Sequence, residues 1–509
     1  MKHLNKRTLP IITALAIVTA IIILRSTTPE PEPHETTLIQ PNQLTTQHYL
    51  EDYQYLVNII ESNYPYLQLK DRTHQTNWLN KQTTTTTRLQ NCNTNTEFLE
   101  IITQEITALQ NRHTRLLTPT EVQKYYTTYQ EVSFMAEIFT EEVAKANQIW
   151  QAYYYDLYES TNKRYPVEIL YDRGNYIITN SQGSTTTQYG ANLTVTHING
   201  TPVHTAIQTA DTYIDHDPTR DQPYIWALTP KSIPDPLITV TYPNGTKFTL
   251  TLPTFYGTPR TNYYPTTNLI TRTYSNQSTA YIYIKTFDSA TTQELAPTIR
   301  NFLEETKEYD YLIIDIRGNT GGAFHSWLDT LVTPLITEPT LHEYYLAYRN
   351  DPYVTTFHDN WLNDRTPVPK NHFTHLPPEV LTSDYNIYNF STIYYPTDTI
   401  NHTAKRILLT DRTVYSAAEG LANYCKQTGY ATIIGTTTGG DGFYVWPLYV
   451  VLPHSKLVIT MTSSMSLDHL GNVNEETRTI PDITRETKIT DYNELIEYTL
   501  RLIGEGKIP

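Results

Sequence analysis

Four short apolar runs with helical segments between them constrain the fold of this chain more than any other feature. They span residues 280–287, 311–316, 406–410 and 431–435. The run YLIIDI at 311–316 is almost continuously apolar, which is typical of a strand in a sheet covered on both faces. Parallel strands need long crossover connections, and the amphipathic segments 291–306 and 416–428 can supply them. The pattern predicts an α/β core built from βαβ units.

The part of the chain before this core has two different characters. Its first half carries apolar side chains at helical spacing, and a capping box formed by Thr94 and Glu97 marks the start of one helix. Its second half holds short β-rich runs, including a hairpin with Asn244-Gly245 at its tip. The expected domains are a helical N-terminal region at 44–160, a small β-rich domain at 161–256, and the α/β core at 257–509 with an insertion at about 346–400.

The N-terminal segment 1–25 has the layout of an export signal. Basic residues at positions 2, 6 and 7 precede the uncharged apolar run 8–24. A run of this length is at the short end of what spans a bilayer, so an uncleaved signal anchor and a cleaved signal peptide both remain open. Either one places the bulk of the chain outside the cytoplasm, with membrane contact through this segment only. Residues 26–43, rich in Pro and Glu, are predicted to be an extended linker.

Charge and cysteine content narrow the possible partners. The chain has 52 acidic and 37 basic residues, a formal charge of −15, which argues against a nucleic-acid partner. Its two cysteines, Cys92 and Cys425, are too few for a disulfide-rich scaffold or a Cys-based zinc site. One disulfide between them remains open. We predict neither a metal site nor a cofactor.

Two segments carry residues suited to chemistry, and each has a plain structural alternative. The run 314–322, IDIRGNTGG, ends in Gly321-Gly322, which leaves backbone N–H groups uncovered but also suits a tight strand–helix turn. The run 408–424 delivers Ser416 to the first turn of a helix. A serine there is either an N-cap or a nucleophile whose neighbour, Ala417, donates its N–H to a developing oxyanion.

Taken together, these segments resemble the serine peptidases that include the C-terminal processing proteases and the tricorn core protease. Four motifs carry the resemblance, in the order 315–322, 413–419, 435–440 and 481–482. The resemblance implies a ClpP/crotonase-like protease core. It also implies that Ser416 is the nucleophile and that the N–H groups of Ala417 and of Gly321 or Gly322 form the oxyanion hole. The segment 197–203 resembles the strand and turn of a PDZ-type module, so a PDZ-like β-rich domain is expected.

The base is where the sequence departs from the processing proteases. Their lysine, in G-K-G, is replaced here by Asp441 in Gly440-Asp441-Gly442, and an aspartate cannot supply a neutral amine. The tricorn-like branch uses a histidine instead, and its turn resembles the one that contains His113. A neutral imidazole near pH 7 suits this task. His325, next to the glycine pair, is the alternative base.

The third member should be an acid that fixes the histidine tautomer. By resemblance to the tricorn-like pattern it lies six residues before Pro481, at Glu475. Its neighbour Glu476 remains open as well. We expect an imidazole nitrogen of His113 to lie within hydrogen-bond reach of the Ser416 hydroxyl. We also expect that a side chain placed at Gly322 would enter the oxyanion hole and leave the fold intact.

The predicted function is that of an exported or membrane-anchored serine endopeptidase that acts through an acyl-enzyme on Ser416. Its partner is a peptide or protein substrate. The alternative is a non-catalytic protein of the same fold that binds peptides or lipophilic ligands. Cleavage specificity and oligomeric state carry no prediction.

Overall fold

The computed structural model describes residues 43–161, 163–164, 169–178, 193–208, 215–217, 222–224, 237–241, 245–251, 255–256, 264–361, 366–442, 447–488 and 491–508. The predicted export segment 1–25 and nearly all of the predicted linker lie outside these residues. Across the described ranges, no helix has both the length and the apolar character needed to cross a bilayer.

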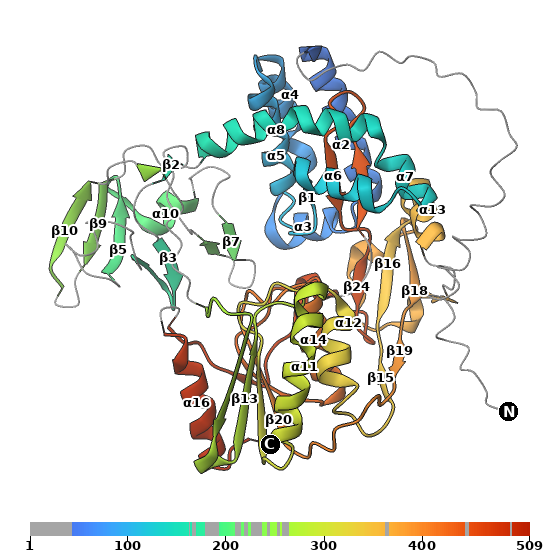
Figure 1. The fold of residues 1–509 in the computed structure, drawn as a ribbon. Helices are drawn as coiled ribbons and strands as arrows, with labels where there is room; N and C mark the ends of the chain where they lie inside the picture. The colour runs from blue at the N-terminus through green and yellow to red at the C-terminus, as the bar shows by residue number, and fades with distance from the viewer. Residues whose placement is uncertain are drawn as a thin grey trace, which may run out of the picture.

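The predicted α/β core is present as a six-stranded sheet (Figure 1). Its strand order is β12 (Leu269–Tyr274), β13 (Thr279–Ile284), β14 (Tyr311–Asp315), β20 (Lys405–Thr410), β21 (Thr432–Gly435) and β25 (Ile483–Thr484). The first pair is antiparallel, and every later pair is parallel. Because the parallel strands follow chain order, the loops at their carboxyl ends all meet at one edge of the sheet.

Both faces of this sheet are covered, which explains the continuous apolar runs. Side chains such as Ile314 and Leu408 pack with one set of helices, and Ile313 and Ile407 pack with another. The first face is covered by α11 (Ser289–Glu305), α12 (Phe324–Trp327) and α14 (Ala417–Thr428), and the second by α16 (Asn493–Gly504). Pro297 lies inside α11 without delaying its start, since Asp288 caps the helix by accepting from the Thr291 N–H.

The N-terminal helices share a second core with strands from the C-terminal half. These helices are α2 (Thr46–Asn63), α3 (Leu67–His74), α4 (Gln82–Gln90), α5 (Asn95–Thr107), α6 (Pro119–Thr128), α7 (Ser133–Ile138) and α8 (Glu141–Thr161). The predicted capping box is confirmed, because Thr94 and Glu97 exchange hydrogen bonds at the start of α5. Apolar side chains of the helices pack with those of β16 (Tyr345–Arg349), β18 (Tyr385–Asn389), β22 (Leu448–Val451), β23 (Val458–Met461) and β24 (Met465–Leu467).

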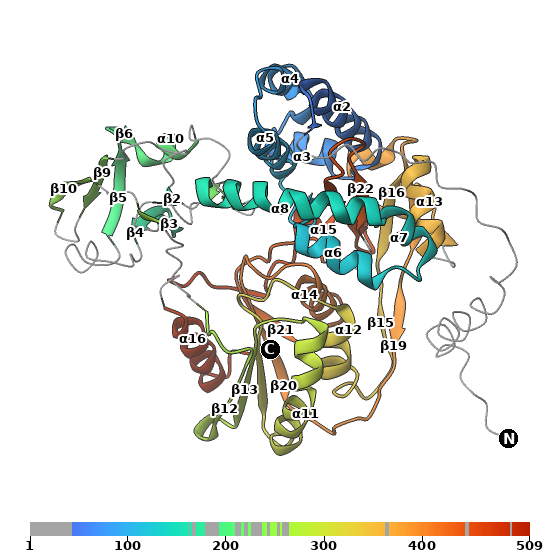
Figure 2. The same cartoon turned by 45° about the horizontal axis from the view of Figure 1, so that its top comes forward.

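The segment predicted as an insertion, at about 346–400, forms strands and a helix. It supplies β17 (Thr366–Pro367), β18 and the helix α13 (Pro352–Trp361), and β17 and β18 form a four-stranded sheet with β16 and β24. Val354 and Ile387 from this segment lie in the same apolar core as the N-terminal helices. The helical region and the insertion thus stabilise each other above the carboxyl edge of the main sheet (Figure 2).

One short strand ties the N-terminal region to the α/β half. Strand β1 (Arg115–Leu116) pairs antiparallel with β23, with Arg115 opposite Thr460. The pairing fixes the turn that precedes β1, which contains His113. Residues about 300 positions apart are thereby brought to the same edge of the sheet.

The small β-rich domain lies at the far end of α8 in both views (Figures 1 and 2). Its sheet has the order β10 (Lys247–Thr251), β9 (Leu237–Thr241), β5 (Leu193–Ile198), β4 (Asn175–Ile178) and β3 (Ile169–Asp172). The expected hairpin is confirmed, since β9 and β10 pair antiparallel, and Gly245 between them has φ +84°. Helix α10 (Val203–Gln208) contributes Val203 and Ile207 to the domain's core. A PDZ-like relationship stays a prediction.

Candidate active site

Ser416 lies in a strained turn between β20 and α14. Its backbone has φ +57° and ψ −126°, a conformation that costs a non-glycine residue about 1–3 kcal/mol. Its side chain makes no capping hydrogen bond to α14. The N-cap interpretation therefore fails, and the hydroxyl is free to face another partner.

That partner is His113, as expected from the sequence. Nε2 of His113 lies 3.0 Å from Oγ of Ser416. The turn that carries His113 is fixed by Asn111, whose Oδ1 accepts from the backbone N–H of His113 and from the Thr114 hydroxyl. The imidazole is partly exposed, at 36%, so one side of it can meet an incoming ligand.

The other imidazole nitrogen contacts Asp441. Nδ1 of His113 lies 2.7 Å from Oδ2 of Asp441. Three further donors reach this carboxylate, since Tyr66 donates to Oδ1 at 2.9 Å, and Asn111 and Tyr415 donate to Oδ2 at 2.9 and 3.2 Å. Asp441 is buried. A buried carboxylate with four partners is held in one orientation, and it holds the imidazole in turn.

His113 and Asp441 each favour the charged form of the other. Burial alone would raise the pKa of Asp441, but attraction to His113 and hydrogen bonds from His113, Asn111 and Tyr66 outweigh it, so the pKa is lowered. Burial alone would lower the pKa of His113, but the charge and hydrogen bond of Asp441 outweigh it, so the pKa is raised. Burial and the charge of Asp441 raise the pKa values of Tyr66 and Tyr415 well above their usual range, so both hydroxyls stay protonated donors.

The expectation that Glu475 or Glu476 contacts His113 is wrong. Asp441 occupies the position beside Nδ1, and Glu475 accepts instead from Nζ of Lys70 at 2.6 Å. Glu476 faces Arg72, with a shortest contact of 2.7 Å. The sequence did carry a signal for Asp441, because Asp441 stands at the position of the lysine in the G-K-G motif of the processing proteases. We interpreted the change only as the loss of an amine.

The glycine turn after β14 lies directly against Ser416. A Cβ added at Gly321 would stand 2.7 Å from Cβ of Ser416 and 2.9 Å from the backbone nitrogen of Ala417. The N–H of Gly321 is already used, since it donates to Oδ1 of Asn319 at 2.9 Å. Within the described part of the chain, the N–H groups of Gly322 and Ala417 have no acceptor. Of the glycine pair, Gly322 thus carries the available donor.

The expectation that a side chain at Gly322 would leave the fold intact is wrong. Gly322 has φ +143° and forms a bridge with Phe287. A Cβ there would lie 2.1 Å from the carbonyl carbon of Phe287, well inside van der Waals contact. The glycine is therefore required by the close approach of two backbones.

Other candidate residues lie elsewhere. Nε2 of His325, the alternative base, is 3.0 Å from the Ser289 hydroxyl, while His113 occupies the place beside Ser416. Lys426, on α14, forms an exposed ion pair with Asp482 at 2.5 Å. Cys92 and Cys425 are both buried free thiols, so the open question of a disulfide is answered in the negative.

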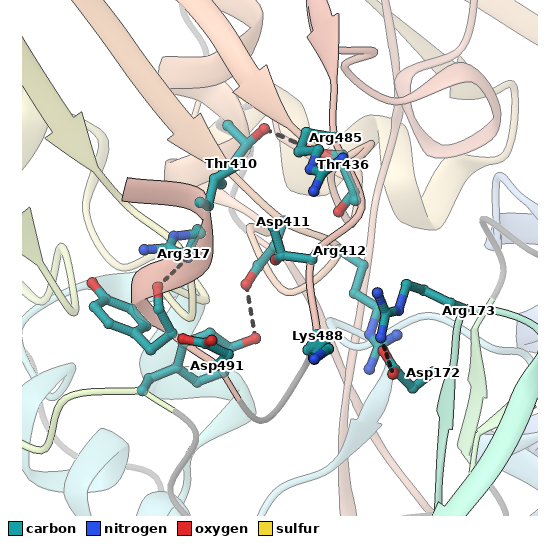
Figure 3. A pocket seen from close by; sticks show the side chains of 14 residues that line it. Asp172, Arg173, Arg317, Thr410, Asp411, Arg412, Thr436, Arg485, Lys488 and Asp491 are labelled. Atoms are coloured by element: carbon teal, nitrogen blue, oxygen red, sulfur yellow. Dashed lines mark hydrogen bonds and ion pairs between the residues drawn. The ribbon is translucent and has the colours of Figure 1, made fainter. Parts of the chain in front are cut away.

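A pocket lies beside the turns that follow β14 and β20 (Figure 3). Its lining includes Arg317, Asp411 and Arg412, which follow β14 and β20. Asp411 accepts from the Tyr264 hydroxyl at 2.7 Å and from the backbone N–H of Thr413 at 2.9 Å. Basic and acidic side chains both line the pocket, and neither Ser416 nor His113 does. Its polar contacts hold the turns that lead to the glycine pair and the serine.

Comparison with known proteins relates the α/β core to a family. Residues 278–485 match the model of peptidase family S41. The matched residues include all five parallel strands of the main sheet, from β13 to β25. The chain contains a domain of peptidase family S41, and the resemblance inferred from its four motifs is confirmed.

Individual relatives extend the comparison. The carboxy-terminal processing protease CtpB of Bacillus subtilis (strain 168) is 27% identical over 165 residues, which are 32% of this chain and 26% of that protein. The chain therefore matches about a quarter of the length of this curated relative. The crystal structure of mature CPAF has a TM-score of 0.58 at 13% identity, covering 90% of this chain and 98% of that one. Mature CPAF complexed with lactacystin gives a TM-score of 0.57, also at 13% identity, with 91% and 98% coverage. The two structures share this chain's fold.

Proposed function

We propose that this chain is a serine endopeptidase with a Ser416–His113–Asp441 triad. The observation that carries the proposal is the pair of contacts at one imidazole: Nε2 lies 3.0 Å from the Ser416 hydroxyl, and Nδ1 lies 2.7 Å from the Asp441 carboxylate. This is the arrangement in which a serine hydroxyl can lose its proton as it attacks a carbonyl.

In the first half of the reaction, Oγ of Ser416 bonds to the peptide carbonyl carbon while its proton passes to Nε2 of His113. The tetrahedral intermediate then collapses, the C–N bond breaks, and His113 returns the proton to the leaving amine. An acyl-enzyme remains on Ser416. Water then attacks the ester while its proton passes to the same imidazole. The bond between the acyl carbon and Oγ breaks, the carboxylic acid leaves, and His113 returns the proton to Oγ, which restores the serine hydroxyl.

Asp441 acts by fixing the tautomer. Its negative charge favours a proton on Nδ1 of His113, which leaves the lone pair of Nε2 directed at Ser416. The carboxylate also stabilises the imidazolium that forms during attack. Tyr66, Asn111 and Tyr415 keep it ionised and immobile, since each donates a hydrogen bond to it.

The developing oxyanion would be stabilised by the N–H groups of Gly322 and Ala417. Both donors belong to backbone that is fixed before substrate arrives, Gly322 by its bridge to Phe287 and Ala417 by the start of α14. One such donor typically stabilises the transition state by about 2.7–4 kcal/mol.

We further propose that the reaction takes place outside the cytoplasm on peptide or protein substrates. The basic residues within positions 1–7 and the apolar run 8–24 support export or anchoring. The small β-rich domain, held at the end of α8, would then present or admit the substrate chain.

A serine-directed fluorophosphonate probe tests the proposal without knowledge of the substrate. The wild-type protein should become labelled, and Ser416→Ala should not. Lys426→Ala serves as the matched control on the same helix, because its ammonium pairs with Asp482 away from the triad. Equal labelling of wild type and Ser416→Ala, or none of either, would favour a non-catalytic binding protein.

A further inference from the structure

A buried ion pair lies behind the triad. Nζ of Lys70, on α3, is 2.6 Å from Oε1 of Glu475, on α15 (Asn474–Thr477). The two side chains are only 2% and 3% exposed. Lysine and glutamate are almost never buried so completely unless they are paired. The pair joins the N-terminal helices to the segment that adjoins the catalytic loop.

The second oxygen of Glu475 faces that loop. Oε2 of Glu475 is buried and has no hydrogen-bond partner among the residues that the structure describes. A Cβ added at Gly440 would stand 3.3 Å from it, so this oxygen lies against the backbone immediately before Asp441. Two buried carboxylates, Glu475 and Asp441, therefore lie at one turn.

Lys70 is the ion-pair partner of Glu475, and two further buried charged side chains adjoin the same turn. Cγ of Arg478 would lie 3.3 Å from a Cβ added at Gly440, and Cγ of Glu419 would lie 2.3 Å from one added at Gly442. The aromatic groups around the two carboxylates, Tyr66 and Tyr415, stay uncharged because they are protonated. Before proton transfer, Lys70 balances Glu475, and the partner of Asp441 at His113 is a neutral imidazole. During attack His113 becomes positive and pairs with Asp441, which makes two matched pairs.

We propose that Lys70 is a positioning residue: it neutralises Glu475 so that Asp441 is the single uncompensated carboxylate beside His113. A role of Lys70 in catalysis rests on the proposed function. The charge balance itself is a property of the folded protein and is measurable without turnover.

The other charged groups near His113 come from several elements. In its own turn, Arg112 lies over the ring of Tyr415 at 5.3 Å, and Arg115 pairs with Glu121 of α6 at 2.6 Å. Both are present in every variant below. Only the pair on α3 and α15 changes, so its effect on the imidazole can be isolated.

The test is a titration of the His113 ring by NMR in the Ser416→Ala protein, with the signal assigned by its loss in His113→Ala. Lys70→Met leaves an extra buried negative charge and should raise the titration midpoint. Glu475→Gln leaves an extra positive charge and should lower it. Each change should be on the order of one pH unit, and the double variant should return close to the starting value.

The matched control is Arg72→Met. Arg72 pairs with Glu476 across the same two helices and also with Glu379, at 2.9 Å. Arg72 and Glu476 are 36% and 32% exposed, so solvent screens their charges. This variant should leave the midpoint of His113 unchanged. Glu475→Gln keeps the shape of the side chain, so it remains informative even where Lys70→Met fails to fold.

Opposite changes that cancel in the double variant would support the proposal. An unchanged midpoint in Glu475→Gln, or changes of the same sign in both single variants, would overturn it. If the wild-type protein were not labelled by the fluorophosphonate, the proposed function would be refuted. The titration of His113 could still be interpreted in that case.

Discussion

His113 and Asp441 are 328 positions apart in the chain, yet Nδ1 of one lies 2.7 Å from Oδ2 of the other. The contact exists because β1, two residues after His113, pairs with β23 in the C-terminal half. Tyr66 of the N-terminal region adds a hydrogen bond to the same carboxylate at 2.9 Å. The helical region is thus an integral part of the site.

The first prediction concerns pH. The pKa of His113 is raised above its usual 6.5 because the charge of Asp441 outweighs the effect of burial. Protonated imidazole cannot accept the serine proton, so the labelling or hydrolysis rate should fall as pH drops, with a midpoint above 6.5. A rate profile from pH 5 to 9 measures it. In Asp441→Asn the largest raising cause is gone, while burial and the smaller effect of Glu475 remain, so the midpoint of the residual activity should move to lower pH. A midpoint that is the same in both proteins would contradict the assigned pairing.

The second prediction concerns Gly322. Gly322→Ala forces a Cβ to within 2.1 Å of the Phe287 backbone, so we expect a loss of more than about 4 kcal/mol in the free energy of unfolding. Gly429→Ala is the matched control, since Gly429 has φ +68° but open space around its Cβ position. It should cost about 1–2 kcal/mol, from backbone conformation alone. Denaturant melts of both variants provide the comparison, and equal losses would show that the close approach is relieved by relaxation.

The third prediction concerns the buried ion pair at the end of β14. Arg317 donates to Asp315 at 2.7 Å, with exposures of 5% and 0%, and Asp315 also accepts from the Tyr492 hydroxyl at 2.8 Å. Arg317→Leu leaves a buried carboxylate without its cation and should cost about 3–5 kcal/mol of stability. Lys426→Ala removes an exposed ion pair and should cost less than about 1 kcal/mol. Similar melting curves for the two variants would refute this difference.

Most of the α/β core was predictable from the sequence. A strand of a parallel sheet that is buried on both faces is a continuous apolar run, and such a run is recognisable from adjacent residues alone. Predicted strands at 311–316 and 406–410 correspond to β14 and β20, and the predicted helix at 416–428 corresponds to α14. The insertion was less predictable. Its strand β18 pairs with β16, and β16 pairs with β24, about 120 positions later in the chain. No local sequence pattern indicates a pairing over that distance.

The candidate site also contains some residues that local motifs predicted and others that they did not. Ser416 and His113 lie in motifs that the sequence displays locally, and the structure brings them together. Asp441 takes the place beside His113 that was expected of Glu475, because the environments of both carboxylates are set by distant residues. Tyr66 reaches Asp441 across 375 positions, and Lys70 reaches Glu475 across 405. A buried lysine partner cannot be inferred from the sequence around a glutamate.

The fourth prediction concerns topology. The apolar run 8–24 leads us to expect that the full chain fractionates with membranes if the segment is retained. A chain that starts at residue 43 should be soluble and should melt cooperatively, since the described helices begin at Thr46. Cell fractionation and a thermal melt measure the two properties. Aggregation of the shortened chain, or a non-cooperative melt, would show that the segment belongs to the fold.

The most direct test of the triad is the rate constant for phosphonylation of Ser416, followed by intact-protein mass spectrometry at a pH above the His113 midpoint. We predict that His113→Ala and Asp441→Asn each react roughly 10⁴-fold more slowly than wild type, and that combining them adds little, because the members act as a unit. Lys426→Ala should react at the wild-type rate. The triad would be contradicted if folded Asp441→Asn reacted at the wild-type rate, or if Glu475→Gln lost more activity than Asp441→Asn.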